Sequence, residues 1–357
     1  EGADAGVVVT ASHNPPTDNG IKLWQPGGQA YDADLRETIT DRIESEAKAP
    51  AAWDETGARE SGNATPRHVE ALSDAVDVDR SLSVVVDVGN GAGGVTAKAL
   101  DALGCQVITL NAQPDGSFPG RPSEPTAENC EALSELVAAT DADLGLAHDG
   151  DADRLRAVTS EGEFLSGDVL LALFARETAD SGQTVAVPVD TSLAVADYLG
   201  ESGIETTRTK VGDVYVAAAA SEEGVAFGGE PSGAWIWPAE TLCPDGPLAA
   251  CKLVELAAET PLQERIAEIP RYPIHRRNVE VADKGAVMER VSAALVAEYE
   301  SASTLDGLRV EFDDGWVLVR ASGTQPIVRL TAEAREEDRA EELMEVAAEH
   351  VAQARDS

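Results

Sequence analysis

A serine follows the first apolar stretch of the chain, in a loop that suits a nucleophile. Residues 6–10 are typical of a β-strand, and the Ala-Ser-His-Asn-Pro-Pro run that follows cannot extend it, because small residues and two prolines interrupt strand and helix alike. Serine is a weak nucleophile that needs a neighbouring base, metal or phosphate relay. His13 adjoins Ser12, and Lys22 lies on the next short apolar segment. These three are candidate catalytic residues, with a solvated turn as the alternative for this loop taken alone.

A second loop carries the strongest metal-binding pattern of the chain. It runs His-Asp-Gly-Asp-Ala-Asp-Arg after a predicted strand, and its acidic residues alternate: Asp149, Asp151 and Asp153. Three alternating carboxylates can converge on one hard cation, and oxygen ligands favour Mg²⁺, Mn²⁺ or Ca²⁺ over zinc. An EF-hand is excluded, because Arg154 and Ser160 stand where it needs glycine and glutamate. An acidic turn without metal is the alternative, but the arginine beside the aspartates favours a metal and anion site.

Two later loops carry groups suited to sugars and phosphates. Glu230 and Ser232 follow a predicted strand, the usual place for ligand groups in an α/β sheet, and carboxylates there often accept paired sugar hydroxyls. Residues 320–329 combine two arginines, two hydroxyls and a glycine, which suits a phosphate cradle better than a plain hairpin loop. Lys210 lies in front of a predicted helix, and the N-terminal end of a helix also favours anions. The candidate anion-binding residues are Lys210, Arg320, Ser322, Gly323, Thr324 and Arg329.

A glycine-rich run after another predicted strand needs to be weighed as a nucleotide site. Gly89, Gly91 and Gly94 satisfy the spacing of the dinucleotide-binding fingerprint. That fingerprint also requires a carboxylate at the end of the second strand to hold a ribose, and Asn111 stands there. We therefore favour a tight turn between strand and helix over a nucleotide site.

Composition restricts the class of protein. The chain has 357 residues, of which 43% are hydrophobic, so it can bury more than one core. Its net charge of −38 argues against nucleic acid and anionic lipid as partners, because both are polyanions. An acidic chain with few lysines that can still fold indicates work in concentrated salt, where screening relieves the repulsion between its charges.

Cysteines and apolar runs favour a cytoplasmic protein. Cys105, Cys130, Cys243 and Cys251 lack the close pairing of a metal site and follow no secretory signal, so we expect buried free thiols. The longest apolar run, at residues 169–175, is far too short to cross a bilayer. We therefore expect no membrane partner.

Strands and helices alternate along most of the chain, and the candidate loops lie at strand ends. Strands are predicted at residues 6–10, 21–24, 83–88, 106–110, 143–147, 184–187, 204–207, 225–227, 272–281, 308–312 and 316–320. Helices are predicted at residues 32–47, 66–76, 94–103, 192–199, 284–298 and 336–354. Further helices are predicted between residues 125 and 143, from Gly167 onward and after residue 213. The alternation changes near Ile269, which indicates a last domain of different topology.

The four loops together resemble the signature loops of the α-D-phosphohexomutases, the family of phosphoglucomutases, phosphomannomutases and phosphoglucosamine mutases. Their order and spacing are similar along nearly the whole chain. The segments are Thr-Ala-Ser-His-Asn-Pro at 10–15, Asp-Gly-Asp-Ala-Asp-Arg at 149–154, Gly-Glu-Pro-Ser-Gly at 229–233 and Arg-Ala-Ser-Gly-Thr-Gln-Pro at 320–326.

The resemblance implies a multi-domain α/β fold. Related α/β domains with mixed sheets would be followed by a smaller α+β C-terminal domain, around a central cleft. The expected domains are residues 1–66 with the serine loop, 67–165 with the metal loop, 166–268 with the sugar loop and 269–357 with the phosphate loop. Because the chain begins just before the serine loop, we expect most of domain I to be missing, together with a cationic residue that the family usually contributes there.

The resemblance also implies a role for each loop. Ser12 would be a phosphoserine that also contacts Mg²⁺, with one ion held by the three aspartates. Glu230 and Ser232 would bind sugar hydroxyls, and the residues of the phosphate loop would bind the substrate's phosphate. Lys22 and Arg154 would neutralise charge during the transfer, and His13 or Lys22 would assist proton movement.

The implied reaction interconverts the 1-phosphate and 6-phosphate of a hexose or hexosamine through a hexose 1,6-bisphosphate. Val211-Gly212-Asp213 looks more like the phosphoglucosamine mutases than the phosphomannomutases. Two departures are Ala234, where many members have histidine, and Gln325 in place of the common glutamate. We expect a small sugar phosphate as substrate and a monomer or homodimer. A Mg²⁺-dependent sugar phosphatase, a nucleotide-binding oxidoreductase and a non-catalytic truncated fragment are the competing hypotheses.

Overall fold

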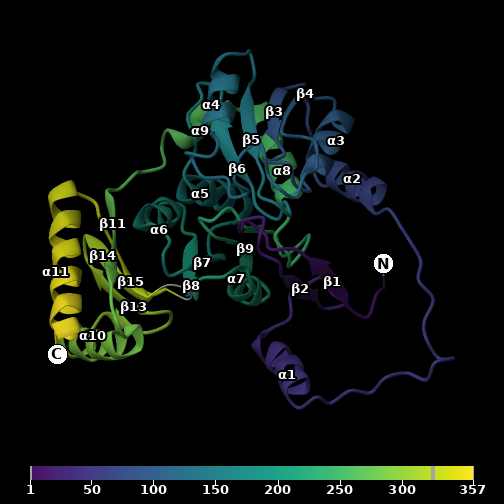
Figure 1. Ribbon diagram of the computed structural model, residues 1–357. Helices are drawn as coiled ribbons and strands as arrows, with labels where there is room; N and C mark the ends of the chain where they lie inside the picture. The colour runs from purple at the N-terminus through teal and green to yellow at the C-terminus, as the bar shows by residue number, and fades with distance from the viewer. Residues whose placement is uncertain (1, 323–325, 357) are drawn as a thin grey trace. The chain divides into compact units, whose positions relative to one another are not determined.

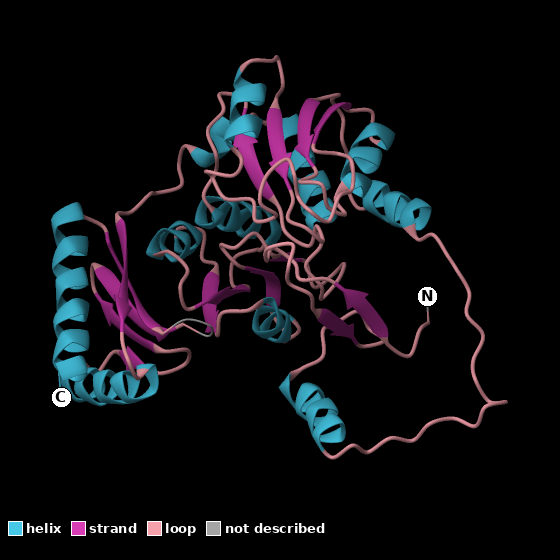
Figure 2. Cartoon of the chain, in the orientation of Figure 1, coloured by secondary structure: helices cyan, strands magenta, loops and turns pink. Residues whose placement is uncertain are grey.

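A computed structural model describes residues 2–322 and 326–356 (Figures 1 and 2). The chain divides into two compact units. The first contains residues 1–165, 233–235 and 240–263, and the second contains residues 166–232, 236–239 and 264–357.

The first unit begins with a two-stranded antiparallel ribbon, which holds the serine loop between its strands. Strand β1 (Gly6–Val9) pairs with β2 (Ile21–Trp24), so that Val8 lies opposite Lys22. Helix α1 (Ala33–Glu44) follows, and the side chain of Asp32 caps it by accepting the Leu35 N–H. No residue of this helix is buried within the described chain.

A four-stranded mixed sheet forms the core of the first unit, in the order β4-β3-β5-β6. Strands β3 (Ser83–Asp87), β4 (Gln106–Leu110) and β5 (Leu144–Ala147) are parallel, and β6 (Arg156–Thr159) is antiparallel. Its helices are α2 (Thr65–Asp74), α3 (Gly94–Ala102), α4 (Glu131–Ala138) and α8 (Gly246–Glu259). Strand β5 is buried along its whole length, because helices cover both faces of a parallel sheet. The metal loop leaves the carboxyl end of this strand.

A second sheet, in the order β10-β9-β7-β8, has most of its strands in the second unit. Its parallel strands are β7 (Thr184–Pro188), β8 (Glu205–Thr209) and β9 (Val225–Gly229), and the short β10 (Trp235–Ile236) lies at its edge. The accompanying helices are α5 (Gly167–Thr178), α6 (Leu193–Gly200) and α7 (Asp213–Ala220), with the short α9 (Leu262–Ile266) further along the chain. Glu230 follows the carboxyl end of β9, where ligand groups are expected.

The C-terminal part of the second unit is an antiparallel sheet in the order β11-β15-β14-β13-β12. The strands are β11 (Ile274–Glu280), β12 (Ala302–Ser303), β13 (Leu308–Phe312), β14 (Gly315–Ala321) and β15 (Ile327–Ala334). Helices α10 (Lys284–Glu298) and α11 (Glu337–Asp356) pack against it, with α11 lying along the sheet in Figure 2. The phosphate loop joins β14 to β15.

The α/β class and the change of topology near the C-terminus are confirmed. The predicted strands and helices all form, but β6, α8, β15 and three short elements were not predicted. Helix α8 begins Gly246-Pro247, a pair that usually indicates a turn, although proline is tolerated in the first turn of a helix. None of the described helices is both long enough and apolar enough to cross a bilayer.

Candidate active site

Ser12 lies against the aspartate loop of the first unit. Its hydroxyl donates to Asp149 Oδ2 at 3.1 Å, and its backbone adopts a left-handed φ of 55°. His13 Nδ1 lies 3.3 Å from the same hydroxyl. A Cβ added at Gly150 would lie 2.5 Å from the Ser12 carbonyl oxygen, so the aspartate loop needs glycine there to approach the serine loop. Residues far apart in the sequence therefore place a hydroxyl beside a carboxylate and an imidazole.

The three aspartates of the metal loop converge as expected. One carboxylate oxygen from each lies within 4.8 Å of the others. The turn depends on Ala152, whose φ is 63°, a left-handed conformation that non-glycine residues rarely adopt. Lys22 Nζ lies 2.8 Å from Asp151 Oδ2 and also bonds Asp153 Oδ2. The lysine from strand β2 thus places a positive charge among the carboxylates.

The crowding of acids shifts their titration. Burial, together with the neighbouring Asp153 and Asp151, raises the pKa of Asp149 to about 7. Burial alone would lower the pKa of Lys22, but the two carboxylates that it contacts outweigh burial and raise it, so the lysine stays charged. The loop therefore holds a concentration of negative charge that favours binding of a cation.

The donor set fits a divalent hard cation. All three candidate ligands are carboxylates, the chemistry that Mg²⁺ prefers. Asp151 Oδ1 is buried and has no hydrogen-bond partner among the described residues, so it has a lone pair free for a ligand. The ammonium group of Lys22 already satisfies two other oxygens of the set. Asp149, Asp151 and Asp153 are thus the residues that could hold Mg²⁺.

The glycine-rich run at residues 89–94 packs against the metal loop. Ala92 N–H donates to the Gly150 carbonyl at 3.0 Å. A Cβ at Gly91 would collide with that same carbonyl, and one at Gly93 would lie 2.8 Å from the His148 ring. These glycines therefore permit close packing against the metal loop, and the prediction of a tight turn between strand and helix is confirmed.

A buried polar network that sequence reasoning missed fixes the start of the metal loop. His148 is fully buried, and its ring nitrogens bond Thr96 Oγ1 and the Arg154 carbonyl, each at 2.8 Å. Burial lowers the pKa of His148 to about 4, so its imidazole is neutral. Arg121, also buried, donates to Asp87 Oδ2 and to the His148 carbonyl, each at 2.6 Å. The only sequence signal for this network was an arginine in a loop of a very acidic chain.

Arg154 lies at the other end of the metal loop. Its N–H donates to Asp149 Oδ1 at 3.2 Å, and its Nε lies 3.9 Å from Asp149 Oδ2. Its backbone also forms a bridge with Ala234, which is buried. The guanidinium is thus within the electrostatic reach of Ser12's carboxylate partner.

In the second unit, Glu230 and Ser232 form one hydrogen-bonded group. Glu230 is 6% exposed, and its Oε1 accepts the Gly212 N–H at 2.6 Å. Ser232 Oγ donates to Glu230 Oε2 at 3.2 Å. The carboxylate is therefore held in place by the loop in front of helix α7, the same loop that contains Lys210.

The candidate phosphate-binding residues are partly brought together. Arg320 and Arg329 lie directly opposite each other on β14 and β15, so their side chains share one face of the sheet. Ser322 is buried and its N–H donates to the Ile327 carbonyl at 2.9 Å. Lys210 Nζ lies 5.6 Å from the centre of the Tyr215 ring. Gly323 and Thr324 lie outside the described residues.

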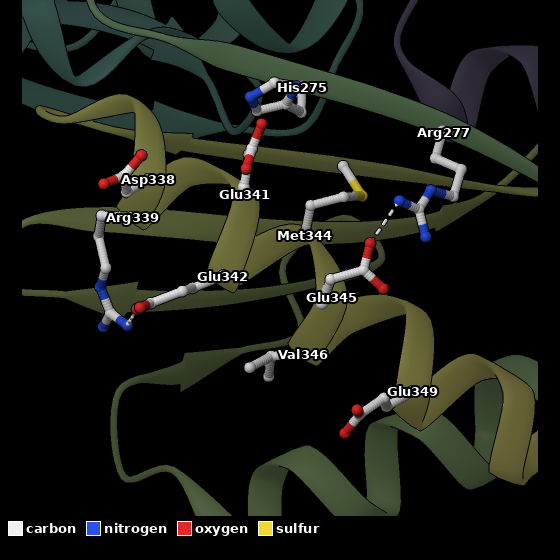
Figure 3. Close-up of a pocket in the computed structure, with 10 residues that line it drawn as sticks. All are labelled: His275, Arg277, Asp338, Arg339, Glu341, Glu342, Met344, Glu345, Val346 and Glu349. Carbon is white, nitrogen blue, oxygen red and sulfur yellow. Dashed lines mark hydrogen bonds and ion pairs between the residues drawn. The ribbon is translucent and has the colours of Figure 1, made fainter.

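A separate group of potential ligands lies on the surface of the C-terminal sheet. His275 faces the first turns of α11, where it bonds Glu337 Oε1 at 3.0 Å and lies near Glu341. Figure 3 shows His275 and Glu341 in a groove with the Arg277–Glu345 and Arg339–Glu342 ion pairs. Both glutamates near His275 are exposed, and exposed ion pairs of this kind contribute little to the stability of the fold. We assign this group no role.

The fold and the two groups of residues define a multi-domain α/β enzyme with an acidic cation site and a separate set of anion-binding residues. The chain belongs to the phosphoglucomutase/phosphomannomutase family. Its four parts match at residues 1–50 (alpha/beta/alpha domain I), 66–162 (domain II), 166–272 (domain III) and 277–350 (C-terminal domain). The expected enzyme class, a phosphohexomutase and thus an isomerase, is confirmed. Because residues 1–50 match domain I, the expectation that most of this domain is missing has no support.

Individual relatives agree with the family. The chain is 50% identical to a probable phosphoglucosamine mutase of Methanopyrus kandleri over 353 residues, which cover 96% of this chain and 78% of the relative. It is 49% identical to one of Methanosarcina acetivorans, over 98% of this chain and 81% of the relative. A phosphoglucomutase/phosphomannomutase family protein of Burkholderia thailandensis has a similar structure, with a TM-score of 0.87, 29% identity and coverage of 98% of this chain and 76% of that one.

Proposed function

We propose that this enzyme interconverts glucosamine 1-phosphate and glucosamine 6-phosphate. The family leaves the sugar open, and the choice rests on the relatives of about half-identical sequence, which are named probable phosphoglucosamine mutases. The Val211-Gly212-Asp213 segment favours the same choice. Phosphomannomutase and phosphoglucomutase activities are the next candidates.

In the proposed mechanism, Ser12 carries the phosphoryl group in the resting enzyme. The observation that supports this role most directly is the contact of the Ser12 hydroxyl with Asp149, inside a cluster of carboxylates that fits a divalent cation. A serine phosphate beside three carboxylates would be repelled without such a cation. The serine and the acidic cluster are therefore proposed to work together.

Asp149, Asp151 and Asp153 are proposed to hold one Mg²⁺. When bound, Mg²⁺ supplies positive charge beside the oxygens of the phosphoryl group in transfer. Lys22 and Arg154, which lie beside Asp151 and Asp149, would add positive charge to the same cluster. His13, whose pKa burial lowers, is poised as a neutral base to take the proton of the attacking sugar hydroxyl.

Residues of the second unit are proposed to hold the substrate. The Glu230 carboxylate would accept hydrogen bonds from sugar hydroxyls, and the Ser232 hydroxyl would donate a hydrogen bond to a sugar oxygen. The sugar's existing phosphate would bind Arg320 and Ser322, with the further contacts of Lys210, Gly323, Thr324 and Arg329. A guanidinium is well suited to this task, because its planar donors match phosphate oxygens.

The proposed reaction conserves the number of phosphoryl groups on the enzyme and the sugar. The hydroxyl of the hexosamine phosphate attacks the phosphorus of phosphoserine, the P–O bond to Ser12 breaks, and a 1,6-bisphosphate forms. The bisphosphate then turns over, and the Ser12 hydroxyl attacks its other phosphate and regains a phosphoryl group. The product is the isomeric monophosphate. The same residues must therefore accept the sugar in two orientations, which explains recognition through hydroxyls common to both poses.

A coupled assay tests the proposal. With Mg²⁺ and a trace of sugar bisphosphate, we expect turnover of glucosamine 6-phosphate at a higher kcat/KM than of the glucose and mannose phosphates. Ser12→Ala should reduce turnover to background, while the exposed Ser45→Ala, on the far end of α1, should not. Release of free phosphate in place of the isomer would instead indicate the sugar phosphatase.

The setting of the reaction is also a proposal. We propose that the protein works in the cytoplasm in concentrated salt, because its net charge of −38 requires screening. A monomer or a homodimer would be compatible with the proposed reaction.

A further inference from the structure

Asp306 lies between the candidate phosphate-binding and sugar-binding residues of the second unit. Its Oδ2 lies 3.1 Å from Arg320 Nη2 and accepts the Val211 N–H at 2.9 Å. Arg320 is on strand β14 of the C-terminal sheet, and Val211 follows Lys210 in the loop before α7. One carboxylate oxygen therefore joins the two parts of the second unit.

The next amide along the chain is held by the sugar-binding residues. Gly212 N–H donates to Glu230 Oε1 at 2.6 Å, and Glu230 Oε2 accepts from Ser232. Two consecutive amides thus bind two different carboxylates: Val211 N–H donates to Asp306, and Gly212 N–H donates to Glu230. These bonds form a continuous series of contacts from Arg320 to Ser232.

The Asp306 end of this series is fixed by backbone packing. Gly307 has a left-handed φ of 72°, and a Cβ added to it would lie 3.2 Å from Arg320 Cα and 2.5 Å from the Val319 carbonyl oxygen. The next residue, Leu308, is fully buried and pairs with Val319. The backbone that carries Asp306 is therefore held beside Arg320 by the strand that follows it.

The Val211 end is packed as well. The Val211 side chain contacts a buried cluster of Val189, Trp316 and Leu318, which joins the β7 sheet to the C-terminal sheet. The loop before α7 is therefore anchored by apolar contacts, independently of its hydrogen bond to Asp306. Both partners of the carboxylate occupy defined positions.

We propose that Asp306 is a positioning residue that sets the spacing between the phosphate-binding and sugar-binding residues. This inference rests on the proposed function, because it takes Arg320 as a phosphate ligand and Glu230 as a sugar ligand. Asp306 itself contacts neither the substrate nor the reacting atoms. Its role is to orient Arg320 through one guanidinium nitrogen and to hold the loop that orients Glu230.

The direction in which a substitution of Asp306 changes ligand affinity distinguishes a positioning role from a simple effect of its negative charge. Removing a negative charge beside Arg320 strengthens the attraction of an anion, if nothing else changes. Loss of positioning weakens binding, but only for a ligand that uses both the phosphate-binding and the sugar-binding residues. A sugar phosphate and inorganic phosphate should therefore respond in opposite ways to the same substitution.

The experiment compares Asp306→Asn with the wild-type protein by calorimetry, using glucosamine 6-phosphate and inorganic phosphate as ligands. We expect about tenfold weaker binding of the sugar phosphate, the size of a lost charge-assisted hydrogen bond, and undiminished binding of inorganic phosphate. KM should rise with a much smaller change in kcat. The control is Asp314→Asn, which removes a carboxylate in the turn between β13 and β14 that lies 3.1 Å from Arg339 on α11, and it should change neither affinity.

Several results would overturn the inference. Wild-type or tighter binding of the sugar phosphate by Asp306→Asn excludes positioning, and equal weakening of both ligands indicates general damage. If Asp306→Asn does not fold, Asp306→Glu keeps the charge, displaces the carboxylate by one methylene, and should show the same contrast between ligands. Unchanged binding of inorganic phosphate by Arg320→Ala would contradict the proposed phosphate-binding role itself, whatever Asp306 does.

Discussion

At the residue scale, chemistry depends on side chains that converge from separate parts of the sequence. The aspartates of the metal loop were predictable because all three belong to one short run. The contact of Lys22 with Asp151 spans 129 positions, and only the family resemblance, not the spacing of either segment, placed the two residues at one site. Asp306 was missed because a single aspartate carries no pattern among 65 acidic residues, and its partners come from other strands and loops.

A histidine away from the acidic cluster makes stability depend on pH. His68 on α2 bonds Asp245 Oδ2 at 2.9 Å, and this hydrogen bond raises the pKa of His68 above its usual 6.5. Asp245 also caps α8, so the pair ties two helices of the first unit together. A raised folded-state pKa means that the contribution is fully present below the unfolded pKa and is lost as pH rises through the folded pKa.

We therefore expect His68→Gln to lower the free energy of unfolding relative to wild type at pH 5.5 and to have little effect at pH 8.5. The difference should be only about a few tenths of a kcal/mol, because the histidine is more than a third exposed and solvent screens the pair. Urea unfolding at both pH values measures it. A difference that stays constant across this range would show that the ion pair is not the cause.

At the element scale, strand ends place the functional loops and glycines let these loops approach one another. The alternation of apolar runs predicted the strands that carry the serine, metal and sugar loops, since each strand is short and bounded by turn residues. It did not predict β15 or α8. Strand β15 begins within the phosphate loop, whose Gly-Thr-Gln-Pro run reads as loop, and α8 begins with a glycine-proline pair.

The glycine-rich run gives a prediction at this scale. Gly91→Ala should reduce kcat by about a hundredfold, because the added Cβ collides with the Gly150 carbonyl and displaces the metal loop by a fraction of an ångström or more. The matched control is Gly94→Ala at the start of α3, where an added Cβ meets nothing within 4 Å. Activity assays with titrated Mg²⁺ measure both variants. Full activity in Gly91→Ala would show that the loop does not depend on this packing.

At the scale of the whole molecule, the family and the fold class followed from the sequence because four signature loops occur in one order. The division of the chain into two compact units did not, since units are defined by contacts that no motif records. The net charge of −38 spreads over both units, and its effect is also a property of the whole molecule.

The salt prediction follows from that charge. We expect the thermal unfolding midpoint to rise steadily between about 0.1 M and about 2 M KCl, because screening removes repulsion among the surface carboxylates. Sucrose at equal osmolality serves as the control for effects of water activity and should stabilise the protein less. A midpoint that falls or stays level with KCl would contradict the proposal of a salt-adapted protein.

Ser12 is proposed to carry a transferable phosphoryl group beside the aspartate cluster. The most direct measurement incubates the protein and its Ser12→Ala variant with a hexose 1,6-bisphosphate labelled in its phosphates, and locates the label by peptide mass spectrometry. We expect one labelled phosphate on Ser12, which a sugar monophosphate then removes. Label on another residue, or equal labelling of Ser12→Ala, would contradict it.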